Sequence, residues 1–187
     1  MSDTKLPLFP LPIFILPNGI ARLRIIEPRY LKMVKIAAQQ QGFVIRLTTD
    51  DIQESDLSWG SWVEIINFNL GKDGVLELDV QCQNLVTLSS IEEDTDKLQF
   101  ANVNVAKHWS QELQQTNNRN LFKPLYDLFR KDSLLADLYK DMPKQNANWV
   151  VARWLELLPV TLNVKKSFIQ EQSFEQAKQF VQSIIFK

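Results

Sequence analysis

The sequence predicts an α+β protein in which a β-rich half precedes a helical half. Up to residue 105 apolar residues tend to alternate with polar ones, the period of a half-buried strand, and beyond residue 106 they recur with the period of a helix. Prolines crowd the first seventeen residues and exclude a helix there. We therefore expect a small, mostly antiparallel barrel or sandwich with one helix over residues 1–105, and a helical subdomain over residues 106–187.

The opening segment combines prolines at positions 7, 10, 12 and 17 with large apolar residues. Because proline fixes φ and donates no backbone hydrogen bond, the segment cannot be one central strand over its whole length. It is predicted to form short extended pieces joined by bends. Four apolar side chains are expected to anchor these pieces in a core: Leu8, Phe9, Phe14 and Ile15.

One helix and six strands are predicted in the rest of the β-rich half. Pro28 stands at the first turn of a helix over residues 28–40, where its missing N–H needs no partner, and Gly42 ends that helix. The glycines of residues 70–75 predict a hairpin turn, and the acidic run at residues 50–56 predicts a solvated loop. The strands are expected at residues 19–26, 43–47, 60–70, 75–80, 84–88 and 98–105.

Apolar stripes with helical spacing follow a polar connector at residues 111–118. The first stripe runs from Leu121 to Phe129, and Ser133 is predicted to cap the next helix. A third stripe over residues 150–158 ends at a proline, and residues 173–176 match a capping box before the last helix.

Composition and charge narrow the class of protein. The chain has 187 residues, 45% of them hydrophobic and 23% charged, which is ordinary for a globular protein with a sizeable core. The first half carries 9 basic and 14 acidic residues and the second half 12 and 8, so neither is basic enough to favour nucleic acid. A single cysteine excludes an internal disulfide and fits the cytoplasm, and no secretory signal or membrane span is expected.

Several segments together resemble the Lon substrate-binding domain, the amino-terminal domain of Lon proteases. They are the proline-rich opening, residues 27–30 (EPRY), residues 60–65 (GSWVEI) before the hairpin, residues 154–159 (WLELLP) and residues 165–170 (KKSFIQ). Their order along the chain also agrees with the family. The resemblance implies a PUA-like pseudo-barrel followed by a small helical bundle, in a free-standing member without the ATPase and peptidase domains.

The resemblance also implies a function, which is non-enzymatic binding of unfolded or tagged polypeptides for proteolysis. Three alternatives stay open: an RNA-binding PUA-like module, an enzyme that acts on a small molecule in a deep pocket beneath the aromatic residues, and an adaptor that docks to a separate ATP-dependent protease. The acidic β-rich half disfavours the RNA reading. The sequence predicts no cofactor, and it leaves open the ligand, the binding face and the oligomeric state.

No assembled catalytic set is apparent in the sequence. His108 is the sole histidine, and its nearest hydroxyl, Ser110, lacks the glycine-framed turn of a nucleophile. Gly71-Lys72 lacks the upstream glycine of a phosphate loop and is predicted to be a turn. Cys82 is expected to be a small buried residue, and the carboxylate runs at 50–51 and 92–94 are expected to be solvated loops rather than acid–base pairs or cation sites.

Aromatic residues offer the best candidates for binding. Trp62 and Phe68 are predicted to share one face of the strand at residues 60–70, with Trp59 beside them. Such side chains at a partly wet edge could anchor an extended peptide, and the alternative is that they belong to the core of the barrel. A structural role is predicted for a second cluster, an ion-paired corner between strand and helix: Arg24, Glu27 and Arg29.

Overall fold

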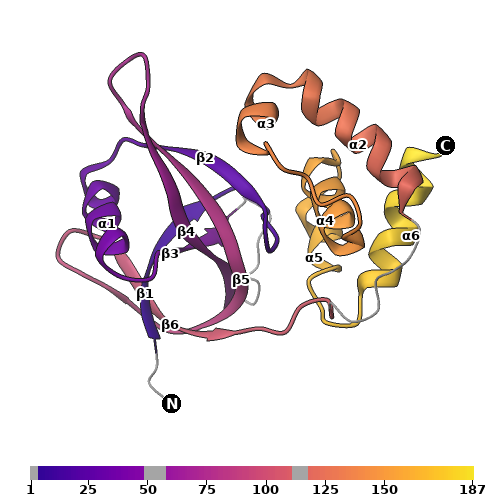
Figure 1. The fold of residues 1–187 in the computed structure, drawn as a ribbon. Helices are drawn as coiled ribbons and strands as arrows, with labels where there is room; N and C mark the ends of the chain where they lie inside the picture. The colour runs from indigo at the N-terminus through magenta and orange to yellow at the C-terminus, as the bar shows by residue number, and fades with distance from the viewer. Residues whose placement is uncertain (1–3, 49–57, 111–117) are drawn as a thin grey trace. The chain divides into compact units, whose positions relative to one another are not determined.

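The structure of the protein, a computed structural model, describes residues 4–48, 58–110 and 118–187. The chain forms two compact units, residues 1–106 and residues 107–187 (Figure 1). The first unit contains β1 (Thr4–Leu11), β2 (Ile20–Ile25), α1 (Pro28–Gln39), β3 (Phe43–Leu47), β4 (Trp59–Leu70), β5 (Leu76–Glu93) and β6 (Gln99–Val105). The second contains α2 (Arg119–Lys131), α3 (Ser133–Leu138), α4 (Ala147–Leu157), α5 (Leu162–Lys166) and α6 (Phe174–Ile185).

The strands of the first unit form one sheet that closes on itself. Their order is β2-β5-β4-β3-β1-β6, and β6 pairs again with β5, so five strands form a ring with β2 attached to one end of β5. All the pairs are antiparallel except β1 with β3. This arrangement confirms the predicted α+β fold with a mostly antiparallel pseudo-barrel followed by helices.

The proline-rich opening forms β1, which lies between two neighbours although it contains Pro7 and Pro10. Each neighbour pairs with only half of the strand: residues 4–7 pair with β6 and residues 8–11 with β3. Neither ladder therefore needs a hydrogen bond from every residue of the segment. The four predicted anchors are all buried, as expected: Leu8, Phe9, Phe14 and Ile15.

The two short strands predicted at residues 75–80 and 84–88 are one long strand, β5. Trp62 and Val63 of β4 face Asn84 and Cys82, so Gln83 between them has no opposite residue. Such a bulge bends a strand without ending it. The length of β5 lets it pair with β2 and β4 through its first part and with β6 through its last part, which closes the ring.

Helix α1 begins and ends where the sequence predicts. Pro28 is its first residue, and Met33, Val34 and Ala37 are its buried face. After the helix, Gly42 has φ of +85° and lies so close to β4 that a Cβ there would come within 2.0 Å of the Val63 carbonyl oxygen. Only glycine fits this position without moving the backbone.

The helical unit confirms the predicted helices but corrects two caps. The cap of α3 is Asp132 and not Ser133, because the Asp132 carboxylate accepts a hydrogen bond from the Leu135 N–H at 2.9 Å. Ser173 precedes α6, but its hydroxyl donates to the Gln170 carbonyl and accepts from Trp109 Nε1, so no capping box forms. The short helix α5 was not predicted. Within the described residues, no helix has the length and apolarity to span a bilayer.

Candidate functional site

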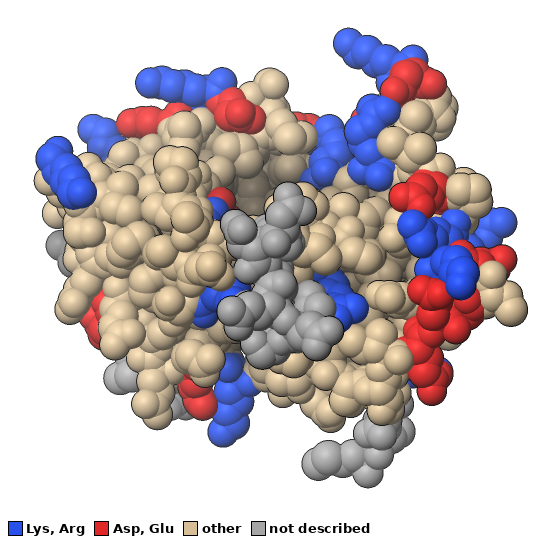
Figure 2. Space-filling model, turned by 180° about the vertical axis from the view of Figure 1, so that it is seen from behind, with Lys and Arg blue, Asp and Glu red and all other residues tan. Residues whose placement is uncertain are grey.

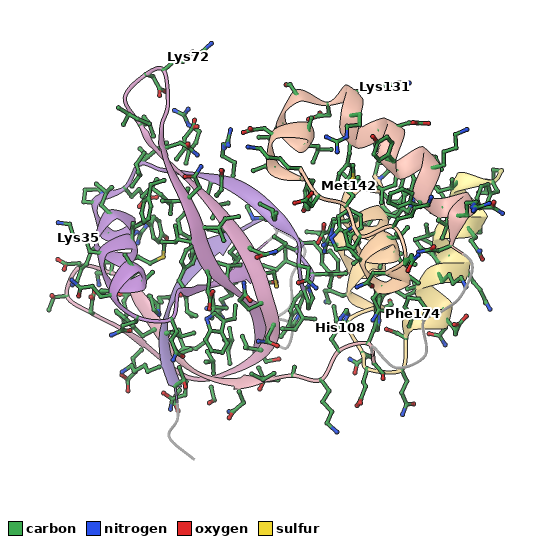
Figure 3. The ribbon with its side chains drawn as sticks, viewed as in Figure 1. Lys35, Lys72, His108, Lys131, Met142 and Phe174 are labelled. Carbon is green, nitrogen blue, oxygen red and sulfur yellow. The ribbon has the colours of Figure 1, made fainter. Side chains whose placement is uncertain are left out.

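Strands β4 and β5 form a long hairpin whose turn lies beyond the rest of the barrel (Figure 1). The turn is closed by two backbone hydrogen bonds of 2.8 Å, from Gly71 N to Val75 O and from Gly74 N to Gly71 O. Lys72 lies at its tip and points away from the barrel (Figure 3). Residues 71–74 thus form a hairpin turn. This confirms the prediction that Gly71-Lys72 belongs to a turn and not to a phosphate loop.

The core-facing side of this hairpin continues past the end of the core. Phe68 faces Leu78 across the strand pair, and Leu70 faces Leu76. Leu78 is fully buried, yet Phe68 is 54% exposed and Leu70 is 74% exposed, because the barrel core does not extend under them. Ile26 is also 70% exposed, but it follows Ile25, the β2 residue that lies opposite Leu76 on the core side, so alternation does not group it with this row. We call Phe68 and Leu70 the hairpin surface.

A second bulge decides which β4 side chains reach the hairpin surface. Ile65 faces Val80 and Asn67 faces Asp79, so Ile66 is inserted without an opposite residue. An inserted residue reverses the alternation of all side chains that follow it. The prediction that Trp62 and Phe68 share a face is therefore wrong: Trp62 packs against the cluster that contains Leu8, whereas Phe68 lies opposite Leu78 of the other cluster.

The opposite face of the hairpin is polar, and its charges pair with one another. Asp79 accepts hydrogen bonds from Arg22 Nε at 2.7 Å, from a second Arg22 nitrogen at 3.0 Å and from Asn69 Nδ2 at 3.2 Å. The hydrogen bonds from Arg22 hold the pKa of Asp79 below its ordinary value. Nearer the turn, Arg24 forms ion pairs with Asp73 and Glu77. This network joins β2 to the hairpin and fixes the strands that carry the hairpin surface.

The two tryptophans named as binding candidates lie away from this surface. Trp59 is buried and meets the ring of Phe14 edge to face, with centroids 6.2 Å apart. Trp62 is half-buried and its Nε1 donates to the Gln41 carbonyl oxygen. Phe68 is the one member of the predicted trio that is more than half exposed.

The predicted ion-paired corner is divided into two parts. Arg29 pairs with Glu27 at 2.7 Å, and Arg24 pairs with Asp73 and Glu77 of the hairpin instead of with Glu27. The reason is the sheet register, which places Arg24 directly opposite Glu77.

The residues considered for nucleophilic chemistry lie within packed regions. Cys82 is fully buried between β2 and β4. His108 is stacked on Trp109 at 4.5 Å, and burial lowers its pKa to about 4, opposed in part by a backbone hydrogen bond with Phe168 and aided by the charge of Arg153. His108 is partly buried, which agrees with the predicted boundary position.

Charged residues of both signs are spread over the face shown in Figure 2. In the face shown in Figure 2, Lys and Arg lie beside Asp and Glu or stand singly, and the coloured residues form no continuous basic area. Residues 92–94 end β5 and open the turn to β6, and each carboxylate has a lysine partner. The described His, Cys, Asp and Glu residues include no group arranged to hold a metal ion. The carboxylates at 50–51 and most of the predicted connector lie outside the described residues.

Sequence reasoning named Phe68 but missed Leu70. The alternation in β4 places Phe68 and Leu70 on one face right up to the glycine turn. The alternation was visible in the sequence. The point at which the core ends beneath the hairpin depends on the whole barrel, so the sequence of this strand alone does not predict it.

The comparison with known proteins agrees with this architecture. No protein-family model matches the sequence, and no curated protein matches it. A crystal structure of a Lon N-terminal domain protein from Xanthomonas campestris is 25% identical, with a TM-score of 0.68, and the match covers 96% of this chain and 98% of that one. The N-terminal domain of the Mycobacterium avium complex Lon protease is 9% identical, with a TM-score of 0.65, and the match covers 96% and 97% of the two chains.

The pseudo-barrel followed by a helical unit therefore belongs to a recognised structural class. Both neighbours are Lon N-terminal domains, and each match extends over nearly the whole of both chains. The chain has the fold of the Lon N-terminal domain, as the sequence predicted.

Proposed function

We propose that this protein is a non-enzymatic module that binds exposed apolar segments of unfolded or tagged polypeptides on the hairpin surface. The observation that carries the proposal is the exposure of Phe68 and Leu70 side by side on one face of the hairpin, beyond the end of the core. Large apolar side chains grouped at the surface commonly mark interaction sites. The Lon N-terminal fold supports the same reading, because the family resemblance implies recognition of substrates for proteolysis.

The two faces of the hairpin favour an apolar ligand over a charged one. On the polar face, the carboxylates of Asp73, Glu77 and Asp79 all have arginine partners. A charged ligand would have to compete with these pairs, whereas an apolar segment gains by covering Phe68 and Leu70. The dispersed charge gives no comparable support to an RNA ligand.

The absence of enzymatic activity is part of the proposal. The sole histidine has a pKa of about 4 and is shielded by Trp109, so it is a weak base at neutral pH. The sole cysteine is fully buried in the barrel. Both positions suit packing better than chemistry.

Fluorescence anisotropy tests the proposal directly. A labelled protein that is kept unfolded by reduction and carboxymethylation is titrated with this chain, and the folded, oxidised form of the same protein is the control. We expect saturable binding of the unfolded form and at least a tenfold weaker affinity for the folded form. Equal affinities, or no binding of either form, would refute polypeptide recognition.

A second measurement separates direct substrate binding from the adaptor role. An adaptor docks to a separate ATP-dependent protease through a folded surface, so its docking would persist when an unfolded polypeptide saturates the hairpin surface. If the unfolded polypeptide does not bind but a protease does, the adaptor role replaces the one proposed.

A further inference from the structure

A pocket of about 520 Å³ opens on the barrel unit, separate from the hairpin surface. Its floor is apolar, because Ile36 of α1 and Phe100 of β6 line it and also pack against the core. The volume lies within the range of about 300 to 1,000 Å³ that is usual for ligand sites. Four elements contribute to its wall, so its shape is fixed by the fold and not by one loop.

The rim of the pocket is acidic. Three consecutive carboxylates, Glu92, Glu93 and Asp94, line it together with one cation, Lys5, and the amide of Gln40. The lining residues carry a formal charge of −2, which Lys32 and Lys97 offset from outside the lining by pairing with Asp94 and Glu93. The lining offers an anionic ligand no unpaired cation, because its only lysine already pairs with Glu92.

The three carboxylates differ in how firmly they are held. Asp94 accepts from Lys32 Nζ at 2.8 Å and from the backbone N–H groups of Asp96 and Leu98 at 2.9 and 3.0 Å. Lys32 and Lys5 hold the pKa values of Asp94 and Glu92 below their ordinary values, so both remain ionised at neutral pH.

The ion pair of Glu93 is the longest of the three. Its partner is Lys97 at 3.1 Å, with side chains that are 41% and 72% exposed. An ion pair with that exposure contributes little to stability, so a ligand cation can replace Lys97 at small cost. Glu93 is thus the carboxylate that is available to a ligand.

We propose that this pocket binds a primary alkylammonium group at the end of a flexible apolar chain. The methylene groups lie against Ile36 and Phe100, and the ammonium group reaches Glu93 at the rim. Long basic side chains bind in this divided way, with the stem on apolar surface and the charge near water. The same chemistry occurs in a lysine side chain of a polypeptide and in a free diamine or polyamine. The proposal does not depend on the function assigned to the hairpin surface.

Three probes of matched shape test the proposal by NMR titration of the ¹⁵N-labelled full chain. They are Nα-acetyl-lysine amide, 1,5-diaminopentane, and Nα-acetyl-norleucine amide, which has the lysine stem without its ammonium group. We expect the two amines to shift the amide resonances of residues 36, 40, 92–94 and 100, and the norleucine compound to bind at least fivefold more weakly. Tighter binding of the lysine compound assigns the site to polypeptides, and tighter binding of the diamine assigns it to free polyamines.

Two variants make the test specific. Glu93→Gln should raise the Kd of the amines about two- to fivefold, the range expected for a partly exposed charge pair. Glu64→Gln, the same change at an exposed position on β4 that does not line the pocket, should leave the Kd unchanged. The proposal is overturned if no probe shifts these resonances, if norleucine amide binds as well as lysine amide, or if the two variants behave alike.

Discussion

Replacing Phe68 and Leu70 together by serine tests whether the hairpin surface binds apolar polypeptide. Full burial of a large apolar side chain is worth about 1.5 to 3 kcal/mol. Phe68 retains 54% of its exposure and Leu70 retains 74%, so a ligand that covers both gains about 2 to 4 kcal/mol from them. Since about 1.4 kcal/mol is a tenfold change in affinity, the double variant should bind an unfolded polypeptide at least about 25-fold more weakly.

The assay is the anisotropy titration with the carboxymethylated protein, and Val105→Ser is the matched control. Val105 is 60% exposed on β6 and lies outside the hairpin surface, so its replacement removes exposed apolar area, smaller than that of the double variant, from another part of the barrel. Far-UV circular dichroism establishes that each variant is folded. If the double variant is folded and loses no more affinity than Val105→Ser, the hairpin surface is not the binding site.

Three further predictions concern the scaffold. The pKa of His108 is about 4 in the folded chain and 6.5 in an unfolded one, so the folded state binds fewer protons at acidic pH. The free energy of unfolding, measured by urea titration, should therefore fall by about 3 kcal/mol between pH 6.5 and 4. His108→Gln should abolish that part of the pH dependence. Gly42→Ala should lower the free energy of unfolding by at least about 2 kcal/mol, since the positive φ and the Val63 carbonyl both oppose a Cβ; an unchanged urea midpoint would contradict the close approach. Ser61→Ala should cost about 1 to 2 kcal/mol in the same measurement, because the buried Ser61 hydroxyl donates to the Ile15 carbonyl at 2.6 Å; a loss below 0.5 kcal/mol would show that this hydrogen bond contributes little.

The fold could be predicted in large part because its elements are encoded locally. The change of period near residue 105, Pro28 at the start of α1 and Gly42 after its end each act within a few residues. The sequence could not reveal which strands pair with one another when they are distant in the chain. The division of β1 between two neighbours and the continuity of β5 through a bulge depend on strands that are distant in the chain.

The surface proposed to bind a ligand was harder to predict for the same reason. Strict alternation assigns Trp62 and Phe68 to one face, and the residue inserted at Ile66 reverses that assignment. The degree of burial is also hard to predict from the strand alone. Leu78 and Phe68 share a face, but the core covers Leu78 and leaves Phe68 exposed. A list of aromatic residues therefore locates the strand but not the side chains that the fold leaves exposed on it.

The hairpin has one apolar and one polar face, and the polar face supports the role proposed for the apolar one. Binding costs less free energy when the binding groups are already ordered, because fewer side chains and backbone segments lose freedom. On the polar face, the pairing of Asp79 with Arg22 joins β2 to β5, and Asn69 adds a bond from β4. That network orders the three strands without using any residue of the hairpin surface. Phe68 and Leu70 can then stay exposed on an ordered backbone, which would lower the free-energy cost of the binding proposed for them.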